Sequence, residues 1–166
     1  MHVFLTGDKG VGKSTIINSF LLTLNCNIGG FRTVRKIRDG MAFVHMLDIN
    51  KADSPGAGNI VAVRDVRGFH PCTEQFDAIG TAILSDIKDI ELIVMDEIGP
   101  GESGAVHFQR AIISRLNGSI PIIGVLQKAE SEFIDKIRRH ANVLPIEVTE
   151  ENRDEISCRL SAYLKI

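Results

Sequence analysis

The sequence has little of what secreted, membrane-bound or nucleic-acid-binding proteins usually contain. Its 166 residues include only three cysteines, Cys26, Cys72 and Cys158, which are too widely spaced to indicate a disulfide framework. Scarce, unpaired thiols favour a reducing, cytoplasmic setting. No stretch is long and apolar enough to span a bilayer, so no membrane association is expected. A formal net charge of -2 gives no general electrostatic footprint for nucleic acid, which is not expected as a partner.

Nothing in the chain indicates more than one folding unit. Its length suits a single hydrophobic core, and we find no internal repeat, low-complexity segment or clear linker. We therefore expect residues 1–166 to form one domain. The opening residues 1–6 lack a basic region and a cleavage site, so they predict a first strand rather than a signal peptide.

Short apolar segments alternate along the chain with segments of helical periodicity. This alternation predicts an α/β protein with a mainly parallel central sheet covered by helices on both faces, a three-layer arrangement. The expected strands are residues 3–5, 92–95, 120–126 and 143–148. The expected helices are residues 14–24, 75–87, 106–116, 133–137 and 151–164.

One segment departs from this simple alternation. Residues 32–36 and 41–49 read as two strands joined at Asp39-Gly40, because Asp-Gly supplies the positive φ angles that a tight hairpin needs. We therefore expect an added β-hairpin beside the parallel strands. A loop rich in Gly, Pro and Ser follows at residues 51–59, and a further short strand at residues 60–63.

The clearest motif lies directly after the first strand. Residues 7–14, Gly-Asp-Lys-Gly-Val-Gly-Lys-Ser, fit the pattern G-x-x-x-x-G-K-S in full, between a predicted strand and a predicted helix. Glycines let the backbone curl so that successive N–H groups and the positive end of the helix bind phosphates. Lys13 is expected to bridge the β- and γ-phosphates, and the Ser14 hydroxyl to ligate Mg²⁺. The motif predicts a P-loop that holds a nucleoside triphosphate with Mg²⁺ as cofactor.

Two adjacent carboxylates end the apolar strand at residues 92–95. Asp96 is expected to anchor the magnesium ion, because a carboxylate is needed there at the carboxyl edge of the sheet. Glu97 is positioned to orient a water and accept its proton during attack on the γ-phosphate. The alternatives are a strand-end Asp that caps the next turn and a solvated loop Glu.

Two short matches to a GTP-binding pattern are weaker. Residues 65–68 and 96–99 both fit D-x-x-G, but the expected N-K-x-D after a later strand is replaced by Gln127-Lys128-Ala129-Glu130. Lys128 is a candidate to lie along a base, or else a solvated lysine. Because the acid that would read guanine is displaced or altered, guanine specificity is not expected.

An arginine near the γ-phosphate would stabilise the charge that develops in the transition state. No spacing rule selects one among Arg32, Arg35, Arg38, Arg110 and Arg153. Arg153 follows the last strand, which places it at the ligand edge of a parallel sheet. It and Asn152 equally suit a structural role in the first turn of the last helix.

Several stretches in one order resemble the THEP-type nucleoside-triphosphatase family. They are residues 2–14, 30–40, 94–99 and 149–153, with Glu102 and Phe108 between the last two. The resemblance spans nearly the whole chain and implies a P-loop NTPase fold and Mg²⁺-dependent hydrolysis of nucleoside triphosphates to diphosphates, with loose base preference. This chain departs from the family at Pro100-Gly101-Glu102-Ser103, where a lysine is missing, in its shortened hairpin and at residues 57–72.

The first functional hypothesis is therefore a nucleoside-triphosphate phosphohydrolase, with Lys13 and Glu97 in catalysis and Ser14 and Asp96 at the metal. A nucleotide or small-molecule kinase with its acceptor site near the hairpin, and a nucleotide-dependent switch protein, are the alternatives. The expected nucleotide-binding residues are Gly7, Asp8, Lys9, Gly10, Val11, Gly12, Lys13, Ser14, Thr15, Lys128 and Arg153.

Overall fold

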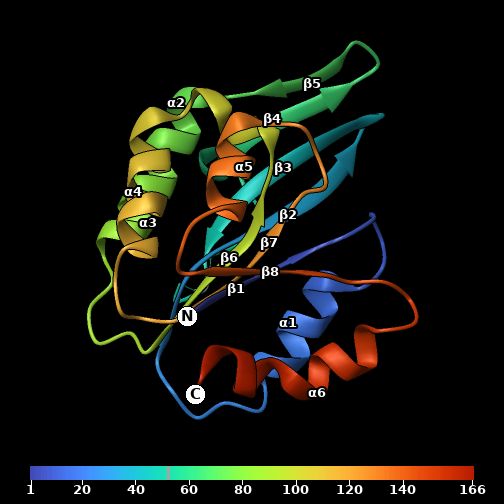
Figure 1. Cartoon of the computed structure of the whole chain (residues 1–166). Helices are drawn as coiled ribbons and strands as arrows, with labels where there is room; N and C mark the ends of the chain where they lie inside the picture. The colour runs from blue at the N-terminus through green and yellow to red at the C-terminus, as the bar shows by residue number, and fades with distance from the viewer. Residues whose placement is uncertain (52) are drawn as a thin grey trace.

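A single twisted sheet runs through the chain in the computed structural model, which describes residues 1–51 and 53–166 (Figure 1). Its strand order is β5-β4-β3-β2-β6-β7-β1-β8. The strands are β1 (His2–Thr6), β2 (Ile28–Arg38), β3 (Met41–Asp48), β4 (Ile60–Asp65), β5 (Gly68–Pro71), β6 (Leu92–Ile98), β7 (Ile122–Leu126) and β8 (Val143–Glu147). The ladder from β2 through β6, β7 and β1 to β8 is parallel, whereas β3, β4 and β5 continue it antiparallel from β2.

Helices cover both faces of this sheet. They are α1 (Lys13–Leu21), α2 (Thr73–Gln75), α3 (Thr81–Ser85), α4 (Val106–Leu116), α5 (Glu132–Arg138) and α6 (Arg153–Leu164). Short helical turns occur at η1 (Ala57–Asn59), η2 (Phe76–Gly80) and η3 (Pro100–Gly104). The predicted helix at 75–87 is observed as the consecutive segments α2, η2 and α3, and the helix predicted at 106–116 as α4. Among the described residues, none of these helices is long and apolar enough to cross a membrane.

The three layers follow from the alternation of side chains along the strands. Val3 and Leu5 of β1 pack with α1 and α6, whereas Phe4 between them packs with α3, α4 and α5 on the opposite face. Figure 1 shows α1 and α6 together on one side of the sheet and α2 to α5 on the other. The predicted α/β, three-layer fold with a mainly parallel sheet is confirmed.

The predicted hairpin is present, and a second one was missed. Asp39 and Gly40 have φ angles of 51° and 75° and form the turn between β2 and β3. The segment at residues 65–68, which matches D-x-x-G in sequence, is instead the turn of a β4–β5 hairpin. There Asp65 Oδ1 accepts hydrogen bonds from the N–H groups of Arg67 and Gly68 at 2.8 and 3.2 Å. The Asp65 carboxylate therefore stabilises the β4–β5 turn.

Candidate functional site

The loop that joins β1 to α1 contains the predicted P-loop. Gly7, Gly10 and Gly12 have φ angles of 130°, 88° and 101°, a region that residues with a side chain rarely adopt. At Gly7, an added Cβ would lie 2.4 Å from the carbonyl oxygen of Val148. All three glycines are thus required by the curl of the loop, and Gly7 is also required by the close approach of the loop to the segment after β8.

Lys13 begins α1 and lies across this loop. Its side chain is only 9% exposed, and Nζ donates hydrogen bonds to the carbonyl oxygens of Gly7 at 2.9 Å and Asp8 at 2.7 Å. The ammonium group is therefore held over the loop opening, where it can exchange these carbonyl acceptors for phosphate oxygens.

Ser14 and Asp96, which are 82 positions apart in the sequence, meet at the carboxyl edge of the sheet. The Ser14 hydroxyl donates a hydrogen bond to Asp96 Oδ1 at 3.0 Å. Burial raises the pKa of Asp96 to about 6, with the hydrogen bond from Ser14 opposing this effect, the negative charge of Glu97 adding to it and Lys13 opposing it. A cation bound nearby would therefore stabilise the ionised form of this buried carboxyl group.

The pair fits a small, hard divalent cation. A hydroxyl and a carboxylate are oxygen donors of the kind that Mg²⁺ prefers, and Mg²⁺ sites commonly use one or two protein ligands with substrate phosphates and waters. Within residues 1–51 and 53–166, no group of three or more His, Cys, Asp or Glu could hold a metal ion. Ser14 and Asp96 are oxygen donors that fit a divalent cation with further ligands from outside the chain.

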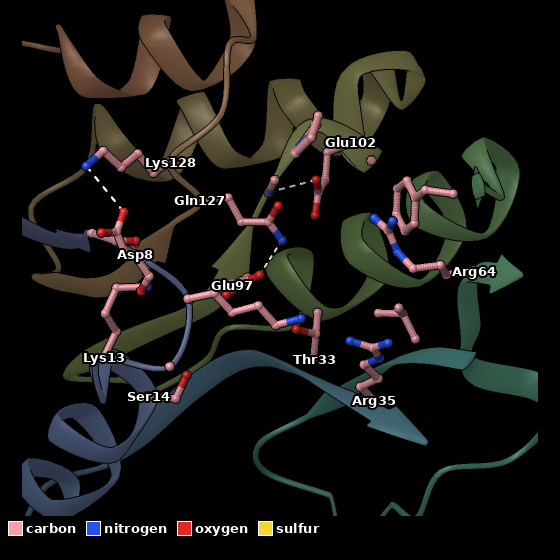
Figure 2. Close-up of a pocket in the computed structure, with 18 of the residues that line it drawn as sticks. Asp8, Lys13, Ser14, Thr33, Arg35, Arg64, Glu97, Glu102, Gln127 and Lys128 are labelled. Atoms are coloured by element: carbon pink, nitrogen blue, oxygen red, sulfur yellow. Dashed lines mark hydrogen bonds and ion pairs between the residues drawn. The ribbon is translucent and has the colours of Figure 1, made fainter. Parts of the chain in front are cut away.

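Beside this pair, the side chain of Glu97 lines a cavity of about 650 Å³ that opens over the P-loop. Gln127, directly after β7, donates a hydrogen bond from Nε2 to Glu97 Oε1. Gly99 makes room for this contact, because a Cβ there would lie 2.6 Å from Gln127 Cδ. Figure 2 shows Glu97 and Gln127 between the P-loop and the arginines on the far side of the cavity.

Glu102 lines the same cavity from η3 and is a buried acid, only 3% exposed. Its Oε2 accepts a hydrogen bond from the Gly99 N–H at 2.9 Å. Burial raises the pKa of Glu102 to about 8; the Gly99 hydrogen bond opposes this rise, and the charge of Glu97 adds to it. At neutral pH this carboxyl group is therefore mainly protonated.

Comparison with known proteins places this site in a family. A family model described as NTPase matches residues 2–160. The chain belongs to this NTPase family. It is accordingly an NTPase-class enzyme, and the expected resemblance to THEP-type nucleoside-triphosphatases is confirmed.

Two relatives of the NTPase match over nearly its whole length. Nucleoside-triphosphatase THEP1 of Methanocaldococcus jannaschii is 31% identical over 177 residues, which span 99% of this chain and 100% of the relative. Nucleoside-triphosphatase THEP1 of Natranaerobius thermophilus is 27% identical over 173 residues, which span 99% of this chain and 96% of the relative.

Two solved structures share the fold of the NTPase. The crystal structure of THEP1 from Aquifex aeolicus superposes with a TM-score of 0.77 at 21% identity and covers 100% of both chains. The solution structure of a human cancer-related nucleoside triphosphatase gives a TM-score of 0.69 at 23% identity, covering 99% of this chain and 97% of the other. At these identities the likeness shows the fold alone.

The other predicted nucleotide-binding residues of the NTPase have different surroundings. Lys128 lines the cavity, and its Nζ lies 3.3 Å from Asp8 Oδ1 and 3.1 Å from Glu147 Oε1 in exposed ion pairs. Those pairs raise the pKa of Lys128, mainly through the hydrogen bond to Glu147. From the P-loop, the cavity lining also includes Asp8, Lys9, Gly10, Gly12 and Thr15, whereas Val11 packs against the core beneath α1.

Arg153 is placed away from these residues. It begins α6, its Nε lies 3.7 Å from Asp154 Oδ1 on the surface, and it is absent from the described residues that line the cavity. Its neighbour Asn152 accepts a hydrogen bond from the Thr149 N–H at 2.8 Å and donates one to the Glu147 carbonyl at 2.9 Å. Asn152 thus closes the loop before α6, which is the structural alternative considered from the sequence.

Sequence reasoning did not find the far wall of the cavity. Thr33, Arg35, Val44, Arg64, Phe69 and Phe76 line it in the structure. Of these, only Arg35 was a candidate, as one of five arginines that no spacing rule could rank. Alternation along the strand from Phe31 would have placed Arg35 on the core face. The faces of Arg64 and Phe69 could not be predicted in this way, because they depend on the register between β4 and β5.

Proposed function

We propose that this NTPase hydrolyses nucleoside triphosphates to diphosphate and phosphate with Mg²⁺ and with loose base preference, and that residues 1–166 act as one domain. The observation that carries this proposal is the hydrogen bond between Ser14 and Asp96 beside Glu97. This contact brings together the Ser14 hydroxyl and the Asp96 carboxylate, the two oxygen donors that the metal of a bound triphosphate would need. The Glu97 carboxylate beside them is proposed to act on water.

Each residue has a distinct part in the proposed reaction. The backbone N–H groups of residues 7–14 bind the phosphates, and Lys13 bridges the β- and γ-phosphates once it leaves the carbonyls of Gly7 and Asp8. Ser14 and Asp96 would hold the magnesium ion, which when bound would neutralise charge developing on the phosphates. Glu97 orients a water and takes its proton as the water oxygen attacks the γ-phosphorus and the diphosphate leaves.

Gln127 supports this role of Glu97. Its hydrogen bond fixes one carboxylate oxygen, Oε1, and leaves the other available for a water. A carboxylate can take a proton from a water or from an alcohol, so the preference for hydrolysis over transfer to an alcohol rests on the relatives that are nucleoside-triphosphatases.

The loose base preference rests on the segment after β7. Gln127 is engaged with Glu97, and Lys128 is paired with Asp8 and Glu147, so neither residue is arranged to read a base edge. Lys128 is proposed to lie along the base once a nucleotide displaces its exposed pairs, and Arg153 to approach the nucleotide from α6.

The three cysteines are free, which supports a reducing, cytoplasmic setting.

Steady-state phosphate release without any added acceptor tests the proposal. ATP, GTP, CTP and UTP are compared in the presence of Mg²⁺ and after its removal by a chelator. Release should require Mg²⁺ and differ little among the four bases. Release that begins only when an acceptor is added would favour a kinase, and a preference for GTP beyond about 10³-fold, about 4 kcal/mol, would show that the base is read.

A further inference from the structure

The cavity is larger than the P-loop alone requires, and its far part is built on different strands. Beyond Glu97 it extends over Thr33 and Arg35 of β2, Arg64 of β4 and Phe69 of β5. Figure 2 shows Lys13 and Ser14 on one side of Glu97 and Arg35 and Arg64 on the other. We call this far part, lined by Thr33, Arg35, Val44, Arg64, Phe69 and Phe76, the arginine chamber.

Strand register places both arginines on the face of the sheet that elsewhere forms the core with α3, α4 and α5. Phe31 is fully buried in that core, and Arg35 lies four residues further along β2, so both side chains point to the same face. Arg64 shares this face, because it follows the buried Ala62 by two residues and pairs with Phe69. A sheet face that is apolar beneath α3, α4 and α5 thus carries two exposed arginines, Arg35 on β2 and Arg64 on β4.

The charges of the chamber are not balanced within the protein. Neither Arg35 nor Arg64 makes an ion pair or a side-chain hydrogen bond with any other described residue, although Arg64 lies 5.2 Å from the centroid of the Phe69 ring. Glu102 in the cavity wall is mainly protonated at neutral pH, and Glu97 is engaged by Gln127. The chamber therefore offers two guanidinium groups to an anion, and guanidinium is suited to bind phosphate through paired hydrogen bonds.

The remaining wall is flat and apolar. Phe69 and Phe76 line it together with Val44, and the backbone of Gly101 approaches both rings. A Cβ at Gly101 would lie 3.1 Å from the Phe69 ring and 3.3 Å from the Phe76 ring, so a larger residue there would press on this wall. Aromatic and apolar walls with a few convergent polar groups are typical of sites for small organic ligands.

We propose that the arginine chamber binds a second phosphorylated ligand at the same time as the triphosphate: a phosphate monoester of a planar compound, of which a nucleoside monophosphate is the common form. The phosphate contacts Arg35 and Arg64, and the planar group lies along Val44 and the two phenylalanines. This goes beyond the proposed hydrolysis and depends on it only for the placement of the triphosphate in the P-loop.

The triphosphate's own nucleoside is not the expected occupant. In the proposed reaction, Ser14 and Asp96 would hold the metal and Glu97 would act on a water beside the γ-phosphate, so the γ-phosphate end of the triphosphate would face Glu97. The nucleoside is attached at the opposite end of the phosphate chain and extends away from Glu97, whereas the chamber lies beyond Glu97 (Figure 2).

Calorimetry on the full chain tests the proposal. The protein is first saturated with Mg²⁺ and the non-hydrolysable analogue adenosine 5′-(β,γ-imido)triphosphate, and adenosine 5′-monophosphate is then titrated. One further equivalent should bind. Arg35→Ala and Arg64→Ala should each weaken that second binding by about 10-fold or more, the worth of a charge-assisted hydrogen bond. Adenosine and ribose 5-phosphate should both bind more weakly than the monophosphate.

Matched controls are available on the same elements. Arg38→Ala lies on β2 three residues after Arg35, is exposed beside Asp39 and should leave the second binding unchanged. Arg67→Ala, in the β4–β5 turn, is the control for Arg64.

The absence of a second equivalent, or an equal effect of all four substitutions, would overturn the proposal. If the triphosphate analogue itself does not bind, the proposed function fails, and monophosphate titrated onto the protein alone still tests the chamber with the same four variants.

Discussion

Gln127 and Glu97 are joined by a hydrogen bond across the carboxyl ends of β7 and β6. Gln127 comes directly after β7, and the absence of a side chain at Gly99 makes room for its amide. The amide therefore orients the carboxylate that we propose to act on water.

Substitution of Gln127 by Leu should lower kcat for phosphate release by about 10-fold to 100-fold. The change removes a hydrogen bond to a charged group, and such bonds contribute about 1.5–3 kcal/mol. Nucleotide affinity should not change, because only the orientation of Glu97 is lost. Steady-state kinetics with a separate measurement of nucleotide binding checks this split.

Gly99→Ala gives an independent check of the same contact. The φ angle of Gly99 is −139°, which alanine adopts readily, so its effect should come only from displacing Gln127. We expect kcat to fall in this variant as well. Unchanged kcat in both variants would show that the hydrogen bond does not serve catalysis.

Lys13→Ala should abolish tight triphosphate binding and leave the fold intact. Lys13 is largely buried across the loop, where its Nζ donates hydrogen bonds to the carbonyl oxygens of Gly7 and Asp8, and it is proposed to move onto the phosphates. Loss of a charge-assisted contact should weaken binding by about 10-fold to 100-fold. Titration with a fluorescent triphosphate analogue measures this, with the exposed Lys136→Ala on α5 as the matched control. Wild-type affinity in the Lys13 variant would contradict the P-loop assignment.

Much of the geometry of the proposed phosphate-binding edge could be predicted because its signals are local. Residues 7–14 are one continuous motif, and Asp96 ends an apolar strand, so the rule for parallel sheets brings Ser14 and Asp96 together. The β2–β3 turn was likewise predicted from Asp39-Gly40 alone, since the type of turn is set by those two residues.

The far wall of the cavity could not be predicted, because it depends on pairing between strands. β5 is only four residues long, and the turn before it resembled a D-x-x-G motif, so the faces of Arg64 and Phe69 were not defined by sequence. Glu102 was named only as a match to the resembled family, and its burial in the cavity wall depends on the fold of η3. Gln127 was judged only as part of a base-reading motif, because its partner Glu97 is 30 residues away.

The buried carboxyl of Glu102 should make stability depend on pH above neutrality. Its pKa in the folded chain, about 8, is above the ordinary value of 4.5, so folding is favoured while the group holds its proton. That contribution is lost as pH rises from about 4.5 through 8, because the unfolded chain ionises first. Between pH 6.5 and 8.5 the free energy of unfolding should fall by about 2 kcal/mol.

Glu102→Gln should remove most of this decline. The amide oxygen can still accept the hydrogen bond from Gly99, but the side chain no longer titrates. Asp96 also has a raised pKa, but its window ends near pH 6, below the measured range. Urea denaturation at each pH measures the slope, with the exposed Glu132→Gln as control. A decline in the Glu102 variant as steep as in the wild type would disprove this assignment.

We propose different roles for Asp96 and Glu97, although the two residues are adjacent. Asp96 contacts Ser14 at the proposed metal-binding edge, whereas Glu97 contacts Gln127 and faces the cavity. Asp96→Asn should therefore weaken Mg²⁺-dependent nucleotide binding together with turnover. A magnesium titration of nucleotide affinity in this variant measures the first effect and phosphate release the second.

Glu97→Gln tests the account most directly. The glutamine keeps the size of the side chain and an oxygen that can accept the hydrogen bond from Gln127, but it loses the basicity needed to take a proton from water. The decisive measurement is the rate of phosphate release at saturating Mg²⁺ and triphosphate, with nucleotide affinity determined in parallel. The account predicts a fall in rate of about 10²–10⁴-fold with unchanged affinity. Phosphate release at the wild-type rate would contradict it.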